Sequence, residues 1–210
     1  MPSDSEPNPA LGLVAAGASI DDLRAAAEGC TACELYRDAT QVVFGSGPEK
    51  ARMILVGEQP GDAEDIEGEP FVGPAGSVLS QALDEAGITP NEFYLTNAVK
   101  HFRWKAKGGR RLHQTPATRH VRACLPWLEA ELATVEPDVI VCLGAVASQA
   151  LLGKSFRVTK DHGKTMRWGG YQVVATIHPS AVLRAAEPEE RARLRAMLVD
   201  DLATAARLTG

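Results

Sequence analysis

The stretch Met53-Ile-Leu-Val-Gly57-Glu-Gln-Pro-Gly61 joins a short apolar run to a loop rich in glycine and proline. An apolar run of this kind, ending in glycine, is typical of a strand that is buried on both faces of a parallel sheet. Similar runs recur downstream, and we expect strands at 53–57, 93–96, 139–143 and 172–176. Helical patterns separate them. The order predicts an α/β fold with a single domain, in which helices flank a mainly parallel four-stranded central sheet.

The composition indicates a globular protein that works in water. The chain has 210 residues, of which 45% are hydrophobic and 23% are charged, and this balance excludes a disordered chain. We find no membrane-spanning run and no export signal. We therefore expect a monomer in a bacterial-type cytoplasm, associated with the nucleoid when it acts. Residues 1–17, rich in Pro, Ser and Ala, are expected to form a flexible tail before a domain at 18–210.

The charges are distributed unevenly along the chain. Residues 100–122 hold eight Lys or Arg and no acid, whereas the net charge of the whole chain is −5. The basic segment also contains Phe102, Trp104, Gly108 and Gly109. Cations interleaved with aromatic rings favour a surface for single-stranded nucleic acid, although a solvated loop is the simpler alternative.

Polar side chains follow three of the expected strands. Glu58 comes directly after the first strand, Asn97 ends the second, and His178 follows the last. Because open parallel sheets place their sites at the carboxyl ends of the strands, we expect these residues to share a cleft. An Asn amide can both donate to and accept from the N3–H and O4 edge of uracil. A His can donate a hydrogen bond to an oxyanion. Taken singly, a turn-forming Asn and a structural His beside a helix-capping Ser180 are commoner.

The first loop also contains Pro70-Phe-Val-Gly-Pro-Ala-Gly76. Its glycines allow the backbone to approach a ligand closely. Phe71 is either a platform on which a base stacks or a plug of the core.

The four cysteines divide into two kinds. Cys30 and Cys33 have the spacing of metal ligands, and Cys124 lies on a predicted helix. Cys142 lies inside a buried strand, where a thiol is usually an inert small hydrophobe, so we exclude it. His101 is the candidate fourth ligand. Three thiolates and one imidazole can hold zinc or an iron–sulfur cluster, and the ligand types alone do not separate the two.

Four motifs together resemble the iron–sulfur uracil-DNA glycosylases, often called family four. They are Gly57-Glu-Gln-Pro-Gly, Pro70-Phe-Val-Gly-Pro-Ala-Gly, Thr96-Asn-Ala-Val-Lys and His178-Pro-Ser. The resemblance runs from about Cys30 to the C-terminal helix. It implies a uracil-DNA glycosylase whose partner is uracil-containing DNA, and it favours a [4Fe-4S] cluster over zinc. The substrate-binding residues that we expect are Gln59, Gly61, Asp62, Phe71 and Asn97.

Two departures from that family look like its UdgX branch. His101 stands where the family has Cys, and a basic loop, Lys107-Gly-Gly-Arg-Arg-Leu-His113, is inserted. In that branch the loop His becomes covalently attached to the abasic sugar, and three Cys and one His hold the cluster. The resemblance thus implies a self-trapping enzyme. Its expected residues are catalytic Glu58, His113 and His178, DNA-binding Lys107, Arg110, Arg111 and Ser180, and cluster ligands Cys30, Cys33, His101 and Cys124.

Three alternatives stay open from the sequence. The chain could be a conventional glycosylase that turns over and releases abasic DNA. It could be a protein that senses uracil in DNA without chemistry, or a zinc-stabilised nucleotide-binding protein. The presence of both Glu58 and His178 argues against a pure sensor, which needs neither group. Single-stranded DNA is the form of substrate that we expect.

Overall fold

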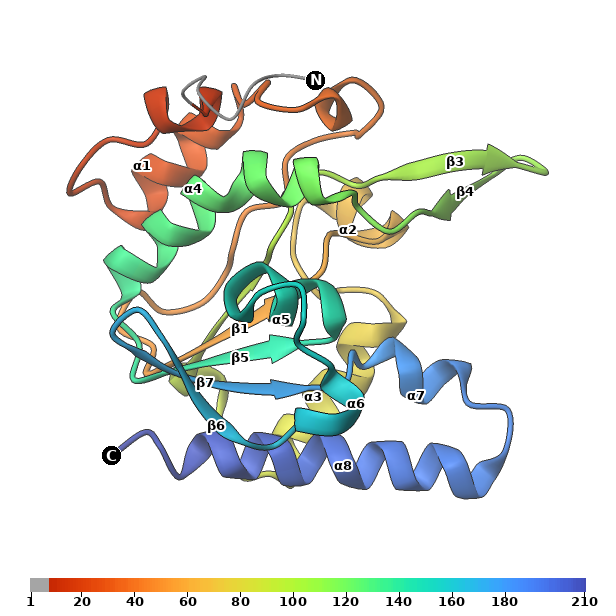
Figure 1. Cartoon of the computed structure of the whole chain (residues 1–210). Coiled ribbons are helices and arrows are strands. Elements are labelled where there is room, and N and C mark those ends of the chain that lie inside the picture. Colours follow the sequence, from red (N-terminus) through yellow and green to blue (C-terminus); the bar gives the residue numbers. More distant parts are fainter. Residues whose placement is uncertain (1–7) are drawn as a thin grey trace.

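The structure is a computed structural model that describes residues 8–210. Its centre is a five-stranded sheet in the order β2-β1-β5-β7-β6 (Figure 1). The strands are β1 (Met53–Gly57), β2 (Phe93–Asn97), β5 (Val139–Leu143), β6 (Thr165–Trp168) and β7 (Tyr171–Thr176). The four predicted strands are confirmed and are mutually parallel. The fifth, β6, was not predicted; it pairs antiparallel with β7 at the edge of the sheet.

Helices cover both faces of the sheet (Figure 1). The α-helices are α1 (Ile20–Ala27), α2 (Asp62–Glu67), α3 (Pro74–Glu85), α4 (Thr118–Val135), α5 (Ala145–Leu152), α6 (Val158–Asp161), α7 (Ser180–Arg184) and α8 (Pro188–Ala206). Short 3₁₀ helices are η1 (Pro9–Gly12), η2 (Glu34–Arg37) and η3 (Pro90–Glu92). One core packs α1, α4 and α5 against the sheet, and a second packs α3 and α8 against the other face. Strands β1 and β5 lie between these cores, and every residue in them is buried, as their apolar sequences require.

Local signals place most helix starts. Ser19 caps α1 and forms a capping box with Asp22. The pair Thr115-Pro116 is a typical start of a helix, yet α4 starts further along the chain. The helix begins at Thr118, because the ring of His120 accepts a hydrogen bond from the Ala117 N–H and takes the place of a capping side chain.

The inserted basic segment forms a β-hairpin. Strand β3 (Trp104–Lys107) pairs antiparallel with β4 (Arg110–His113). Gly108 and Gly109 connect them with φ of 57° and 73°, which is the backbone that a tight two-residue hairpin turn requires. The hairpin extends outward from the fold beside α2 (Figure 1), and it carries His113 at the end of β4.

The flexible tail expected at residues 1–17 falls partly outside the described residues. From Asn8 onward the chain packs against α4: the Asn8 amide donates to the carbonyl of Arg122 at 2.8 Å, and Ala10 is fully buried. Within residues 8–210, no helix is both long and apolar enough to cross a membrane.

Candidate active site

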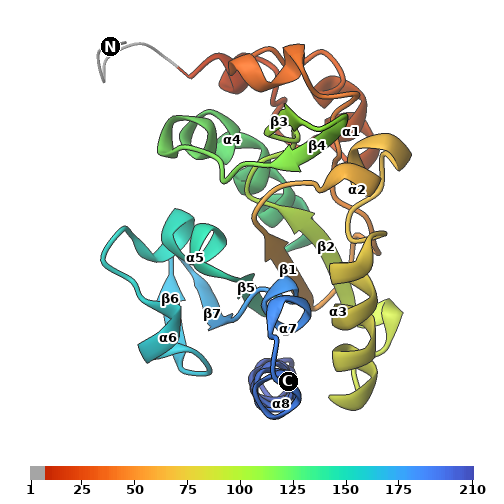
Figure 2. The ribbon, with the colours of Figure 1, turned by 90° about the vertical axis from the view of Figure 1, so that its right-hand side faces the viewer.

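A cavity of about 730 Å³ opens at the carboxyl ends of the strands, on the side of the molecule that Figure 2 shows. The loops after β1, β2 and β7 form its wall, together with the end of β4 and helix α7. Nine of the residues expected in the site line it: Glu58, Gln59, Gly61, Asp62, Phe71, Asn97, His113, His178 and Ser180. The fold therefore brings together side chains from four separate segments, as the positions at the strand ends predict.

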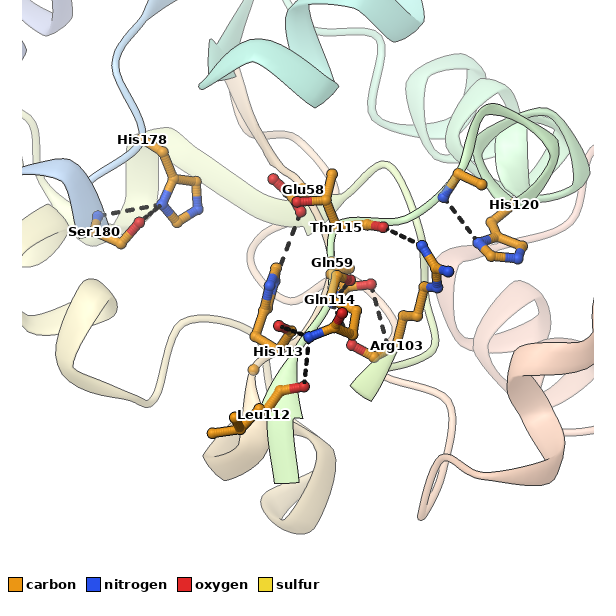
Figure 3. A network of polar contacts seen from close by, with 12 residues as sticks. Glu58, Gln59, Arg103, Leu112, His113, Gln114, Thr115, His120, His178 and Ser180 are labelled. Atoms are coloured by element: carbon orange, nitrogen blue, oxygen red, sulfur yellow. Dashed lines mark hydrogen bonds and ion pairs between the residues drawn. The ribbon is translucent and has the colours of Figure 1, made fainter. Parts of the chain in front are cut away.

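Glu58 and His113 face each other in this cavity (Figure 3). The Nε2 atom of His113 lies 3.6 Å from Glu58 Oε1, just beyond hydrogen-bond distance. Glu58 Oε1 is buried and has no hydrogen-bond partner in the described chain. Burial raises the pKa of Glu58, although Arg184 and Thr115 oppose this shift. Burial also lowers the pKa of His113, and the charge of Arg184 lowers it further. Near neutral pH, an uncharged imidazole thus faces a carboxyl oxygen that lacks a hydrogen-bond partner.

Gln59 does not present its amide to the cavity as a free group. Its Nε2 donates to the carbonyls of Arg103 and Gln114, each at 3.2 Å, and its Oε1 accepts from the Arg103 N–H at 3.2 Å. Arg103 and Gln114 flank the hairpin and bond to each other at 2.9 Å. The side chain of Gln59 is therefore a clasp on the base of the hairpin, one residue away from Glu58 (Figure 3).

The ring of Phe71 lies beside that of His178, with centroids 6.4 Å apart and planes inclined by 26°. Phe71 has φ of 60°, a left-handed conformation that residues other than glycine rarely adopt. The strain persists because the surrounding structure holds it: a Cβ at Gly76, on α3, would collide with the Phe71 carbonyl. Close packing of the loop on α3 thus aims the ring into the cavity.

Asn97 ends β2 and is buried at the floor of the cavity. Its neighbour across the sheet is Gly57. A Cβ at Gly57 would collide with Asn97 Oδ1 and would lie 2.7 Å from Phe71 Cζ. Lys100 Nζ donates to the Asn97 carbonyl at 2.9 Å, which fixes the strand end. Glycine at position 57 is therefore what allows the amide and the aromatic ring to lie side by side.

His178 carries a defined tautomer. The Ser180 N–H donates to His178 Nδ1 at 3.2 Å, and Ser180 Oγ lies 2.7 Å from the same nitrogen. Since Nδ1 accepts, the neutral ring has its proton on Nε2. Burial, with the charge of Arg184 and the proximity of His113, lowers the pKa of His178 to about 4. Near neutral pH the ring is thus an uncharged donor on the wall of the cavity.

Glu64 joins the two ends of the first loop, a role that the sequence analysis did not assign. Its carboxylate accepts from the N–H groups of Gly61 and Gly73, each at 3.0 Å. Gly61 and Asp62 then line the cavity at the start of α2.

Arg111 is held by protein groups. Its guanidinium pairs with Asp62 at 2.6 Å and with Asp65 at 2.5 Å, and it lies 5.5 Å from the ring centroids of Phe102 and Trp104. Asp65 is fully buried. These contacts fasten β4 to α2, so Arg111 anchors the hairpin in this structure.

Lys107 and Arg110 differ from Arg111. Both flank the turn of the hairpin, both are exposed, and neither side chain has a polar partner among residues 8–210. These two cations are available for an anionic ligand, as the sequence analysis expects.

The expected cluster ligands lie in the interior. The thiols of Cys30, Cys33 and Cys124 are close enough for their charges to interact, and burial raises the pKa of Cys124 to about 12. His101 is buried, and its Nδ1 has no hydrogen-bond partner among the described residues. Within residues 8–210, no three His, Cys, Asp or Glu side chains converge as the ligands of a single metal ion would. Cys142 is fully buried in β5.

Sequence reasoning missed two polar residues of the cavity wall. Thr115 lines the cavity beside Glu58. Arg184 also lines the cavity, and its Nη1 donates to Ser180 Oγ at 2.8 Å. The available signal for Arg184 was its spacing of one helical turn from Ser180.

Comparison with known proteins agrees with this geometry. The model of the uracil DNA glycosylase superfamily matches residues 44–203. A Type-4 uracil-DNA glycosylase of Thermotoga maritima is 39% identical over 175 residues, which is 82% of this chain and 85% of that protein. The Type-4 enzyme of Archaeoglobus fulgidus is 36% identical over 173 residues, covering 79% and 83%, respectively. That of Pyrobaculum aerophilum is 35% identical over 163 residues, covering 74% and 80%. With the family model spanning most of the chain and the cavity holding the motif residues, this chain belongs to the uracil-DNA glycosylase superfamily.

Proposed function

We propose that this chain excises uracil from DNA and then traps the abasic sugar covalently on His113, as the resemblance to the UdgX branch implies. The observation that carries the proposal is the position of His113 in the same cavity as Glu58, Asn97 and His178. A nucleophile held against the reacting carbon has a high effective concentration, which water lacks.

Base recognition comes first. The target nucleotide must leave the stack before side chains reach its sugar. Phe71 stacks on the extruded uracil, and the Asn97 amide pairs with the N3–H and O4 edge. Gly61 and Asp62 bound the pocket beside it. The side chain of Gln59 supports this pocket through the hairpin instead of contacting the base.

Breaking the bond between C1′ and N1 leaves the electron pair on uracil and positive charge on the sugar. The Nε2–H of His178 donates to the uracil O2 as negative charge grows there, and one such donor is worth on the order of 10² to 10³ in rate. The Glu58 carboxylate stabilises the cationic sugar.

The lone pair of a His113 ring nitrogen then forms a bond to C1′. The other ring nitrogen loses its proton, and Glu58 Oε1 accepts it. Uracil leaves as the anion and is protonated by solvent. The ring on C1′ is then a neutral N-alkyl imidazole, which is a poor leaving group, so one turnover inactivates the protein.

DNA binding outside the cavity falls to the hairpin and to α7. Lys107 and Arg110 hold phosphates by charge. Ser180 contacts the phosphate next to the target. Arg111, which is paired with two aspartates, acts by presenting β4 and shifts to a phosphate only if those pairs open.

A [4Fe-4S] cluster would be held by Cys30, Cys33, Cys124 and His101. The residues fit such a group: the thiols are near one another, the His101 Nδ1 is an orphaned buried atom, and two N–H groups already point at sulfur. Trp127 Nε1 donates to Cys30 Sγ and the Lys100 N–H donates to Cys124 Sγ, each at 3.3 Å, as is usual around cluster thiolates. The cluster would supply a structural tie between the N-terminal cysteine pair, the loop after β2 and α4.

A conventional, multi-turnover glycosylase is the second candidate, because the Type-4 relatives are 35–39% identical over most of the chain. Mass spectrometry after incubation with a uracil oligonucleotide separates the two. We expect a protein–DNA adduct whose modified peptide contains His113. Uracil release with no adduct would establish the conventional enzyme, and an adduct at another residue would overturn the role of His113.

A further inference from the structure

A second cationic segment lies between α5 and β6. Residues 153–164 contain Lys154, Arg157, Lys160 and Lys164 against a single acid, Asp161, in a chain whose net charge is −5. Asp161 pairs with Lys164 at 2.8 Å. Lys154 and Lys160 are exposed, and neither side chain has a polar partner among the described residues.

Arg157 directly precedes α6, and its side chain is held by the loop between α5 and α6. Its Nη1 donates to the carbonyls of Lys154 and Phe156, at 2.7 and 3.0 Å. The guanidinium is thus folded onto the loop next to Lys154, while its remaining N–H groups face solvent. A fixed guanidinium with free donors is the arrangement that recognises phosphate.

This segment shares a face with the cavity. In Figure 2, which looks onto the strand ends, the β3–β4 hairpin lies above them, α6 lies below and to the left, and α7 lies to the right of α6. The Gly163 N–H donates to the carbonyl of Ala175, near the end of β7, which places the segment at the carboxyl edge of the sheet. The cavity therefore has unpaired cations on two sides.

We propose that Lys154, Arg157 and Lys160 form a second phosphate-binding surface, which holds the DNA strand on the side of the cavity away from the hairpin. The inference rests on the proposed function, since it assumes that the uracil nucleotide occupies the cavity. A strand seated there must continue in both directions, and no cation on the side away from the hairpin has been assigned a role.

The test replaces Lys154, Arg157 and Lys160 together by Gln. The matched control replaces Lys50, Arg52 and Arg167 by Gln. It removes the same amount of charge near the amino ends of the strands, opposite the carboxyl ends where the cavity opens. Lys50 and Arg52 precede β1, and Arg167 pairs with Gln172 near the start of β7. The substrates are uracil oligonucleotides of about 5 nucleotides, and of about 20 with the extension on only one side of the uracil.

Single-turnover uracil release at increasing protein concentration gives the apparent affinity and the maximal rate. We expect the triple variant to bind a long substrate about tenfold more weakly, or worse, at an unchanged maximal rate. Binding should weaken only for the substrates that are extended on one particular side of the uracil. The short substrate and the control variant should show no loss of affinity. Equal losses on short and long substrates, or on both directions of extension, would overturn the inference.

The salt dependence of binding gives an independent reading. With a long oligonucleotide that has thymine for uracil, fluorescence anisotropy measures affinity without chemistry. Losing three phosphate contacts should lower the slope of log K against log salt by about 2, at about 0.7 per contact on a single strand. An unchanged slope refutes the second surface, whereas absent uracil release by the unaltered chain refutes the proposed function.

Discussion

His113 Nε2 and Glu58 Oε1 lie 3.6 Å apart, and the carboxylate oxygen has no other partner in the described structure. The hairpin and the end of β1 supply the two groups separately. A shift of a few tenths of an ångström would make a hydrogen bond, and apo sites often tighten in this way when substrate binds. In the proposed mechanism, this arrangement lets Glu58 take the imidazole proton when His113 attacks C1′.

Replacing His113 by Ser should convert trapping into turnover. The variant keeps Glu58, Asn97 and His178, so bond cleavage continues, while water in place of imidazole attacks C1′. On a denaturing gel the retarded protein–DNA band should vanish, and uracil release should exceed one equivalent per protein. A persistent band with this variant would exclude His113 as the nucleophile.

Replacing Gln59 by Leu should separate excision from trapping. The hairpin base loses three hydrogen bonds, and His113 is held less firmly at the sugar, whereas His178 and Asn97 stay in place. We expect the fraction of excision events that end in the adduct to fall several-fold, since small displacements of a reacting group are costly. The matched control is Gln81→Leu on the exposed side of α3. If both variants form the adduct equally well, the hydrogen bonds of Gln59 do not position His113 for trapping.

Replacing Gly57 by Ala should damage base recognition with little effect on folding elsewhere. The added Cβ collides with Asn97 Oδ1 and approaches Phe71 Cζ, so both must shift. In single-turnover uracil release, we expect the protein concentration that gives half the maximal rate to rise at least tenfold, because a pocket with misplaced polar groups binds the base poorly. Gly170→Ala is the control, since a Cβ there meets nothing within 4 Å. An unchanged half-saturating concentration would show that the close approach at position 57 is unimportant.

Trapping should depend on pH through His113. Its pKa is lowered from 6.5 by burial and by Arg184, so the neutral, nucleophilic ring persists to more acidic solution than a free imidazole would. The rate of adduct formation should be flat near neutral pH and should fall only below pH 6.5. His178, with a pKa of about 4, stays neutral over that range. Quenched-flow measurement of adduct against pH tests this, and a midpoint above 6.5 would contradict the assigned environment.

Cys124 in α4 and Cys142 in β5 are both buried thiols, but replacing them by Ala should have different effects on the protein. Cys124→Ala is expected to lose iron, the visible absorbance of the cluster and several degrees in Tm, because the tie between α4 and the N-terminal segment is cut. Cys142→Ala should keep iron and colour and lose only packing. Iron analysis of both purified variants decides the assignment, and equal iron contents would remove Cys124 from the ligand set.

Much of the fold could be predicted because its central strands are buried on both faces. Runs such as 53–57 and 139–143 contain no charged or strongly polar side chain, and an uninterrupted apolar run of this length indicates a strand that is buried on both faces. The edge strand β6 has exposed Thr165 and Arg167 on one side, and its pattern is too short to stand out. The hairpin was missed for another reason: the Gly108-Gly109 turn signal was present, but the segment was interpreted as a basic loop that binds nucleic acid.

The site divides in the same way. Glu58, Asn97 and His178 could be predicted, because each follows a strand and parallel strands end together. The clasp by Gln59 could not be predicted, because its partners Arg103 and Gln114 lie 44 and 55 residues away in the chain. The pairing of Arg111 with Asp62 and Asp65 likewise depends on how α2 meets the hairpin.

The hairpin begins and ends at adjacent points, where Arg103 and Gln114 bond to each other. Because the two ends of the hairpin already touch, a change in its length would leave the strands of the core in place. The sequence of β4 is less free to change, since Arg111 fastens that strand to the buried Asp65. The tip of the hairpin is therefore the place where protein engineers can add residues without disturbing the fold below it.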